Sequence, residues 1–167
     1  TSQPENYYRG TVAILIDCNV KNPTRESYSF DSAQRHFHGP LPEGLPIEQA
    51  YLHIGMYLGW CIGQQLVSQQ FLEDCGGLVY RFTRREISCT ILCEALDGEL
   101  APSYFNTQGL KFTQDYYTDQ RYLTDYRELL AHGLPTLYHV TDSWVNFGRL
   151  SGLLSERLAA WKLTQGD

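Results

Sequence analysis

The sequence has few basic residues and no long apolar run, and each absence excludes a class of protein. Its 167 residues include 13 lysines and arginines against 19 aspartates and glutamates, for a net charge of −6. A surface that binds nucleic acid must be positive, so this balance argues against a passive nucleic-acid binder and favours neutral or basic partners. The most apolar stretch, 50–62, contains His53 and is far shorter than the roughly 20 residues that cross a bilayer. We therefore expect no membrane-spanning segment.

Paired cysteine motifs and an export signal are also missing. The five cysteines are an odd number without C-x-x-C spacing, which predicts reduced thiols rather than a disulfide framework. The amino-terminal segment TSQPENYYRG does not have the basic and then apolar pattern of a secretory signal. Both features favour a cytoplasmic protein. The cysteines are Cys18, Cys61, Cys75, Cys89 and Cys93.

No internal repeat or Ser/Gly linker divides the chain, so residues 1–167 are predicted to form a single domain. The β-branched segment Thr11–Val20 predicts a buried strand, which Ser27–Phe30 could join as a second, short strand. From Pro46 onward the patterns are typical of helices. The predicted fold class is mainly α (α+β): about five to six helices with a small N-terminal β element.

The helices are delimited by caps and by hydrophobic spacing. Ser68 is expected to cap a short helix that ends at Gly76 and Gly77, and Leu134–Val140 is expected to be extended. Asp142 is the predicted N-cap of the last helix. The predicted helices cover about 47–65, 68–75, 78–96, 107–131 and a segment after Asp142.

Two of these helices have patterns that indicate core packing. The helix over 47–65 is apolar on nearly every side, and Gly55 and Gly59 lie on one face, where a neighbouring backbone can approach closely. The last helix has a continuous apolar stripe at helical spacing. The stripe comprises Phe147, Leu150, Leu154, Leu158 and Trp161.

Metal-ligating and catalytic patterns are weak. His36 and His38 would lie on the same side of an extended segment, with Asp31 as a conceivable third ligand, but no further His or Cys pair has metal-ligand spacing. A polar loop is therefore favoured, and no metal or cofactor is predicted. His53 is interpreted as a core histidine bonded to a backbone or tyrosine group. Because the sequence has no hydrolase elbow, P-loop or dinucleotide fingerprint, no catalytic residue is predicted.

The strongest local bias is acidic and aromatic. Residues 96–132 contain six acidic and three basic residues, half of the chain's net charge, together with Tyr116, Tyr117, Tyr122 and Tyr126. On one continuous helix, Asp115, Asp119 and Tyr122 would project from one side and could contact a cationic partner. The alternative is an amphipathic helix whose tyrosines pack inward. The predicted partner-binding residues are Asp97, Glu99, Asp115, Asp119, Tyr122, Asp125 and Glu128.

Two segments resemble an uncharacterised bacterial family of unknown function. They are His53-Ile-Gly-Met-Tyr-Leu-Gly-Trp60 and Leu134-Pro-Thr-Leu-Tyr-His-Val-Thr-Asp-Ser-Trp-Val-Asn-Phe147, and the resemblance covers about residues 31–162. Domains of this kind occur near toxin genes, so the resemblance implies a cytoplasmic immunity protein. It implies no catalytic residues.

Three functions follow as hypotheses. The leading one is an immunity protein that neutralises a cognate toxin or effector, such as a basic nuclease domain, by occluding its active site through the acidic surface. The second is a small hydrolase-like enzyme that uses His53, or His36 and His38, with nearby carboxylates. The third is a scaffold subunit that oligomerises through its apolar stripe. The sequence does not determine the oligomeric state.

Overall fold

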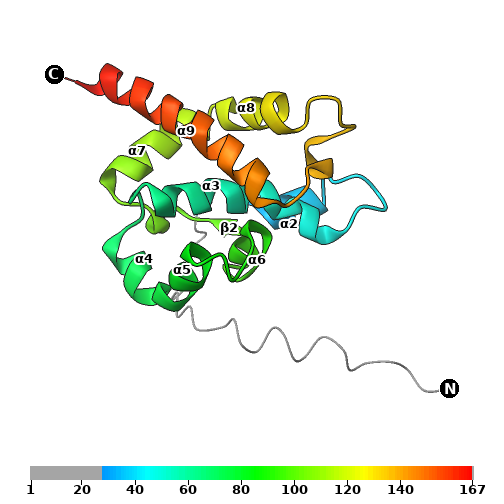
Figure 1. Cartoon of the computed structure of the whole chain (residues 1–167), viewed down its shortest axis with the longest axis horizontal. Coiled ribbons are helices and arrows are strands. Elements are labelled where there is room, and N and C mark those ends of the chain that lie inside the picture. Colours follow the sequence, from blue (N-terminus) through cyan, green and yellow to red (C-terminus); the bar gives the residue numbers. More distant parts are fainter. Residues whose placement is uncertain (1–27, 167) are drawn as a thin grey trace.

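The computed structural model describes residues 28–166, which form a mainly helical body with a small antiparallel sheet (Figure 1). This confirms the predicted fold class. Among the described residues, five helices are substantial: α3 (Leu52–Gly63), α5 (Gly76–Thr83), α7 (Thr107–Tyr116), α8 (Arg121–Leu130) and α9 (Trp144–Gln165). The shorter elements are α2 (Ala33–Phe37), α4 (Gln69–Asp74), α6 (Cys89–Glu94), η1 (Ile47–Ala50), η2 (Pro102–Tyr104), η3 (Leu137–His139), β1 (Asp31–Ser32) and β2 (Glu99–Leu100).

Helix α3 is the centre of the core. Every residue from Leu52 to Cys61 is buried, as the all-round apolar pattern predicts. A Cβ at Gly55 would collide with the backbone carbonyl of Cys89, and a Cβ at Gly59 would meet the Phe82 ring. The two glycines therefore allow α6 and α5 to pack closely against this helix, which confirms their predicted role.

Helix α9 crosses the molecule over α3 and extends beyond the other helices at its end (Figure 1). Leu150, Leu154 and Leu158 are buried, which confirms the centre of the predicted apolar stripe. The indole of Trp60 donates a hydrogen bond of 3.1 Å to Ser155 Oγ and ties α9 to α3. The N-cap of α9 is Ser143, whose Oγ accepts from the Asn146 amide, so the prediction of Asp142 was one residue early.

Two predicted helices are each broken into two. The helix expected over 107–131 is interrupted between α7 and α8, where Gln120 has a left-handed backbone with φ of 61°. The helix expected over 78–96 is interrupted between α5 and α6, where Arg85 is left-handed and Ser88 caps the new helix by accepting from the Ile91 amide. Glycine usually marks a left-handed residue at a helix end, but these two positions are Arg85 and Gln120, so neither break could be recognised from a glycine.

Two other local predictions need correction. Gly76 and Gly77 begin α5 rather than end α4, although Ser68 caps α4 as predicted. The segment Leu134–Val140 contains the 3-10 turn η3 instead of a strand.

The N-terminal β element differs from the prediction in its residues. Thr11–Val20 and Ser27 lie outside the described residues, and 28–30 are not strand. The strand that forms is β1, in which Asp31 pairs with Leu100 of β2. Across residues 28–166, no helix is long and apolar enough to span a membrane.

Candidate functional site

The tyrosines of the acidic segment lie in the core. Tyr116, Tyr117, Tyr122 and Tyr126 are all buried, and the rings of Tyr117 and Tyr122 stack with centroids 4.8 Å apart. The Tyr122 hydroxyl donates to the backbone carbonyl of His53. Tyr122 therefore does not share a face with Asp115 and Asp119, because the chain turns at Gln120 and α8 directs its own apolar side inward. The inward-packing alternative describes these tyrosines correctly.

The predicted acidic residues are dispersed. Asp97, Asp115, Asp119 and Glu128 are exposed, whereas Glu99 is half-buried in β2. Asp115 accepts a hydrogen bond of 2.8 Å from the Trp161 indole.

Asp125 belongs to the protein's interior rather than to its surface. Its carboxylate accepts hydrogen bonds of 2.8 and 2.9 Å from the Arg157 guanidinium and one of 2.5 Å from the Tyr116 hydroxyl. Burial alone would raise the pKa of Asp125, but the hydrogen bonds from Arg157 and Tyr116 outweigh it and lower the pKa below its ordinary value. This residue links α8 to α9.

The structure brings together Asp31, His36 and His53, which come from three different elements. Asp31 is in β1, which is flanked by backbone hydrogen bonds from Phe30 to Leu100 and from Ala33 to Gly98. His36 follows on the inner side of the short helix α2. His53 is in the first turn of α3. One donor atom from each of the three lies within 4.8 Å of the other two. All three side chains are buried, with His53 only 1% exposed. We call them the Asp–His–His cluster.

The polar atoms of the Asp–His–His cluster lie within hydrogen-bond distance of one another. His36 Nε2 lies 2.8 Å from Asp31 Oδ1, and His53 Nε2 lies 3.2 Å from Asp31 Oδ2. The two Nε2 atoms are themselves 3.2 Å apart. Burial would raise the pKa of Asp31, but the contacts with the two histidines lower it far below its ordinary value. Asp31 is therefore a carboxylate at neutral pH.

Two tyrosines support the Asp–His–His cluster from outside. Tyr117 donates a hydrogen bond of 2.6 Å to Asp31 Oδ2, and the Tyr138 hydroxyl lies 2.5 Å from His36 Nδ1. Burial, aided by the charge of Asp31, raises the pKa of Tyr138 to about 12. Both phenols therefore keep their protons at neutral pH. The contact with Tyr138 fixes the orientation of the His36 ring.

His53 is the most enclosed member of the cluster. Burial lowers its pKa, although the neighbouring Asp31 opposes this shift, so the ring is neutral at physiological pH. Its Nδ1 has no hydrogen-bond partner among the described residues. The predicted hydrogen bond to a backbone or tyrosine group is therefore wrong for the side chain, whose polar contacts are to Asp31 and His36.

The arrangement considered for His36 and His38 does not form, and the polar loop favoured for this segment is wrong as well. The segment is the helix α2, in which residues two apart do not share a side, so His36 is buried and His38 is exposed. The second histidine of the cluster is His53. A histidine inside an otherwise apolar helix was the available signal, but its partners could be found only once the fold was known.

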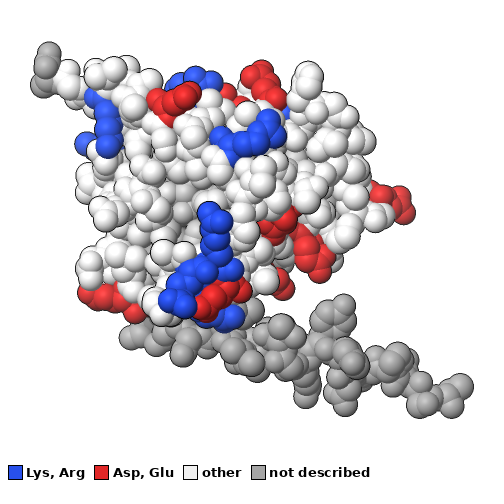
Figure 2. Space-filling view, viewed as in Figure 1, with Lys and Arg blue, Asp and Glu red and all other residues white. Residues whose placement is uncertain are grey.

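One exposed face combines arginine with aromatic residues. Arg84 lies over the Tyr80 ring at 5.3 Å, and Arg85 lies over the Trp144 ring at 5.1 Å. Tyr80 is 61% exposed, and Val145 beside Trp144 is 74% exposed. We call these five residues the arginine face. Figure 2 shows basic side chains gathered in the lower part of the view, where Figure 1 places α5. Glu86 is paired with Arg84 at 2.8 Å.

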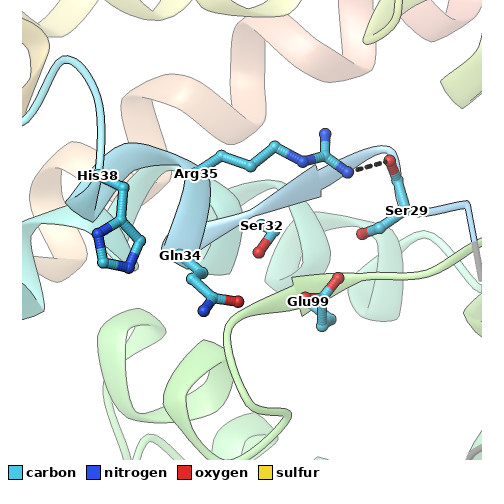
Figure 3. A pocket seen from close by; sticks show the side chains of 6 residues that line it. All are labelled: Ser29, Ser32, Gln34, Arg35, His38 and Glu99. Carbon is cyan, nitrogen blue, oxygen red and sulfur yellow. Dashed lines mark hydrogen bonds between the residues drawn. The ribbon is translucent and has the colours of Figure 1, made fainter. Parts of the chain in front are cut away.

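A shallow hollow of about 360 Å³ lies beside the sheet. Ser29, Arg35, His38 and Glu99 are among its lining residues (Figure 3). Arg35 crosses it and donates to the Ser29 carbonyl at 2.9 Å. A second hollow, of about 340 Å³, is bordered by Tyr138, Arg127 and Pro135. His36 and His53 line neither hollow.

Comparison with known proteins identifies a family but no activity. No curated protein and no solved structure shows a significant match to this chain. The model of a domain of unknown function, DUF7832, matches residues 29–140. This match includes the Asp–His–His cluster and ends before α9, so it is shorter than the expected range of 31–162. Because it spans more than half of the sequence, the chain belongs to the DUF7832 family.

Proposed function

We propose that this protein acts by binding a partner protein, a bacterial toxin or effector, and neutralises it by covering its active site. The observation that carries this proposal is the arginine face. Tryptophan, tyrosine and arginine are the residues most often found at the energetic centres of protein interfaces. Here Arg84 and Tyr80 are exposed and in contact, and the exposed Arg85 lies over the half-buried Trp144. The resemblance of the two sequence motifs supports a toxin as the partner.

The charge of the arginine face supports a partner with an acidic patch. Arg84 and Arg85 are exposed, and Glu86 pairs with Arg84. Complementary charge speeds encounter and orients the partner. The acidic surface is less suited to the same role, since its exposed members Asp115 and Asp119 are no longer accompanied by the four tyrosines.

The experiment compares two matched double charge reversals. The chain is produced with a secreted toxin encoded next to its gene, and the dissociation constant of the complex is measured at two salt concentrations. We expect Arg84→Glu with Arg85→Glu to weaken binding by more than about 30-fold, the effect of losing one strong interface contact. We expect Asp115→Lys with Asp119→Lys to change the dissociation constant by less than about 3-fold.

Each other outcome has a definite meaning. If the aspartate reversals weaken binding and the arginine reversals do not, the partner is basic and the acidic surface binds it. If both pairs bind like the wild type, the proposed face is wrong. A neighbouring toxin that forms no complex with the wild-type protein contradicts toxin neutralisation itself. Circular dichroism confirms that each variant is folded.

The geometry gives less support to the other two hypotheses. A hydrolase-like enzyme that used His53 would have to admit substrate to a side chain that is almost fully enclosed. A scaffold that assembled through the stripe of α9 would have to expose leucines that already pack in the core. Binding through the arginine face requires neither rearrangement.

A further inference from the structure

We infer that the Asp–His–His cluster is a binding site for one divalent metal ion of the zinc type. The site is separate from the arginine face and independent of the proposed toxin binding. Two imidazole nitrogens and a carboxylate oxygen form a common ligand set for zinc, whereas magnesium and calcium prefer oxygen ligands alone.

The spacing of the three donor atoms fits a shared ion. Ligands about 2.0–2.1 Å from a tetrahedral zinc are about 3.3 Å apart from one another. The two Nε2 atoms of His36 and His53 are 3.2 Å apart, and their distances to the nearest Asp31 oxygens are 2.8 and 3.2 Å. The two nitrogens therefore have the separation that a single bound ion requires, and each lies beside a different oxygen of the Asp31 carboxylate.

Either hydrogen atoms or a metal ion can satisfy these three groups. A neutral imidazole nitrogen is either a donor or an acceptor. With hydrogen on both Nε2 atoms, His36 donates to Asp31 Oδ1 and His53 donates to Asp31 Oδ2, while the two nitrogens lie 3.2 Å apart. With bare Nε2 atoms, both lone pairs are available to one ion. A cation accepts electron pairs from all three groups at once.

Charge balance also favours a cation. Asp31 is a buried carboxylate, and among residues 28–166 no lysine or arginine forms an ion pair with it. A buried charge without a counter-charge is costly. A cation beside Asp31 would supply the counter-charge. The Nε2 atom of the neutral His53 ring is the nitrogen that faces Asp31 and His36, while Nδ1 has no partner in the described part of the chain.

The surrounding hydrogen bonds hold the ligands in place. Metal-bound histidines usually use their second ring nitrogen in a hydrogen bond, and Tyr138 is placed to accept one from His36 Nδ1. Tyr117 donates to the carboxylate of Asp31. The ion would join β1, α2 and α3, so its main effect would be to stabilise the packing of these elements.

The test uses the full chain, stripped with chelator and then titrated with zinc. Calorimetry is expected to give one site per chain, and saturation is expected to raise the unfolding temperature by about 5 °C or more. His36→Gln is expected to weaken zinc binding by at least 100-fold. His38→Gln removes an exposed histidine two residues away and is expected to bind like the wild type.

Cobalt provides a readout that does not depend on the variants' folding. Wild-type protein loaded with Co²⁺ is expected to show the visible absorption of a low-symmetry, nitrogen- and oxygen-ligated ion, and zinc is expected to displace it. The inference is overturned if the wild type binds neither ion at one equivalent. It is also overturned if His38→Gln loses binding while a folded His36→Gln retains it, since the ion would then occupy a surface site.

Discussion

At the scale of single residues, burial changes the role of several charged groups. Asp125 is one of seven residues expected on a binding surface, but its carboxylate is enclosed by Arg157 and Tyr116. An acidic residue on a helix that also carries tyrosines has the same local pattern whether it faces solvent or a partner on another helix. Here the distinguishing contact comes from α9, 32 residues further along the chain.

We expect Asp125→Asn to lower the free energy of unfolding by about 2 kcal/mol at pH 7, because it weakens the charge-assisted hydrogen bonds from Arg157. The loss is limited because the Arg157 side chain is 43% exposed and can be solvated. Urea denaturation measures this difference. The control is Glu128→Gln on the same helix, an exposed position at which we expect a change within about 0.5 kcal/mol.

The effect of Asp125→Asn should depend on pH. The folded-state pKa of Asp125 lies below its unfolded value, so its stabilising contribution is present above the unfolded value of about 4 and is lost as the pH falls through the folded value. The stability difference between wild type and Asp125→Asn is therefore expected to be constant from pH 5 to 8 and to shrink in acid. A difference that grew on acidification would contradict this account.

The candidate site was only partly accessible from the sequence. Asp31 and His36 are five residues apart and were considered together, but His38 was the wrong third residue. Finding His53 instead requires knowing that α2 packs beside the start of α3. That arrangement depends on contacts between distant elements and not on local spacing.

At the scale of elements, close helix packing is determined by particular glycines. Gly55 lies where α3 meets the backbone of α6, and Gly63 lies at the exposed end of the same helix with no atom near its missing Cβ. The two positions provide a matched pair for measuring the cost of a single methyl group.

We expect Gly55→Ala to destabilise the protein by about 3 kcal/mol, because the added methyl group collides with the Cys89 carbonyl and α6 must move away. Gly63→Ala is expected to be neutral or to stabilise by up to about 1 kcal/mol, since alanine is the better helix former. Thermal and chemical denaturation of both variants tests this. Equal stability of the two variants would show that α6 does not pack as described.

The outer limits of the helices were predicted better than the breaks inside them. Ser68 was identified correctly as a cap because side-chain caps are local signals, and the helix expected from about 107 begins at Thr107. The breaks at Arg85 and Gln120 were missed because these residues adopt a left-handed backbone without being glycine. The flanking helices bury separate apolar sides, and this tertiary packing compensates for the local cost.

At the scale of the whole molecule, the hydrophobic core extends further along the chain than the residues that match the family. DUF7832 covers 29–140, but the core continues into α9, which contributes Leu150, Leu154 and Leu158. Burial of three leucines is worth about 5–9 kcal/mol, comparable to the whole stability of a typical domain.

A chain that ends after Asp142 is therefore expected to lose cooperative unfolding, since α3 and α8 would expose the surface that α9 covers. Near-ultraviolet circular dichroism and urea denaturation provide the readout. The matched control ends after Lys162, which retains the buried leucines and the contact between Trp161 and Asp115, and should unfold like the full chain. A stable, cooperative fold in the shorter chain would contradict the assigned role of α9.

The buried cysteines can report when helices of the core separate, because a thiol is labelled only after it becomes accessible. Cys61, Cys89 and Cys93 are buried thiols, and burial raises the pKa of each above its ordinary value. Thiolates are the reactive form, so these groups are shielded from alkylating reagents both sterically and chemically while the native packing holds. Cys89 and Cys93 lie on α6, and Cys61 lies on α3. The order in which they become labelled would therefore show whether α6 separates from α3 before the core opens as a whole.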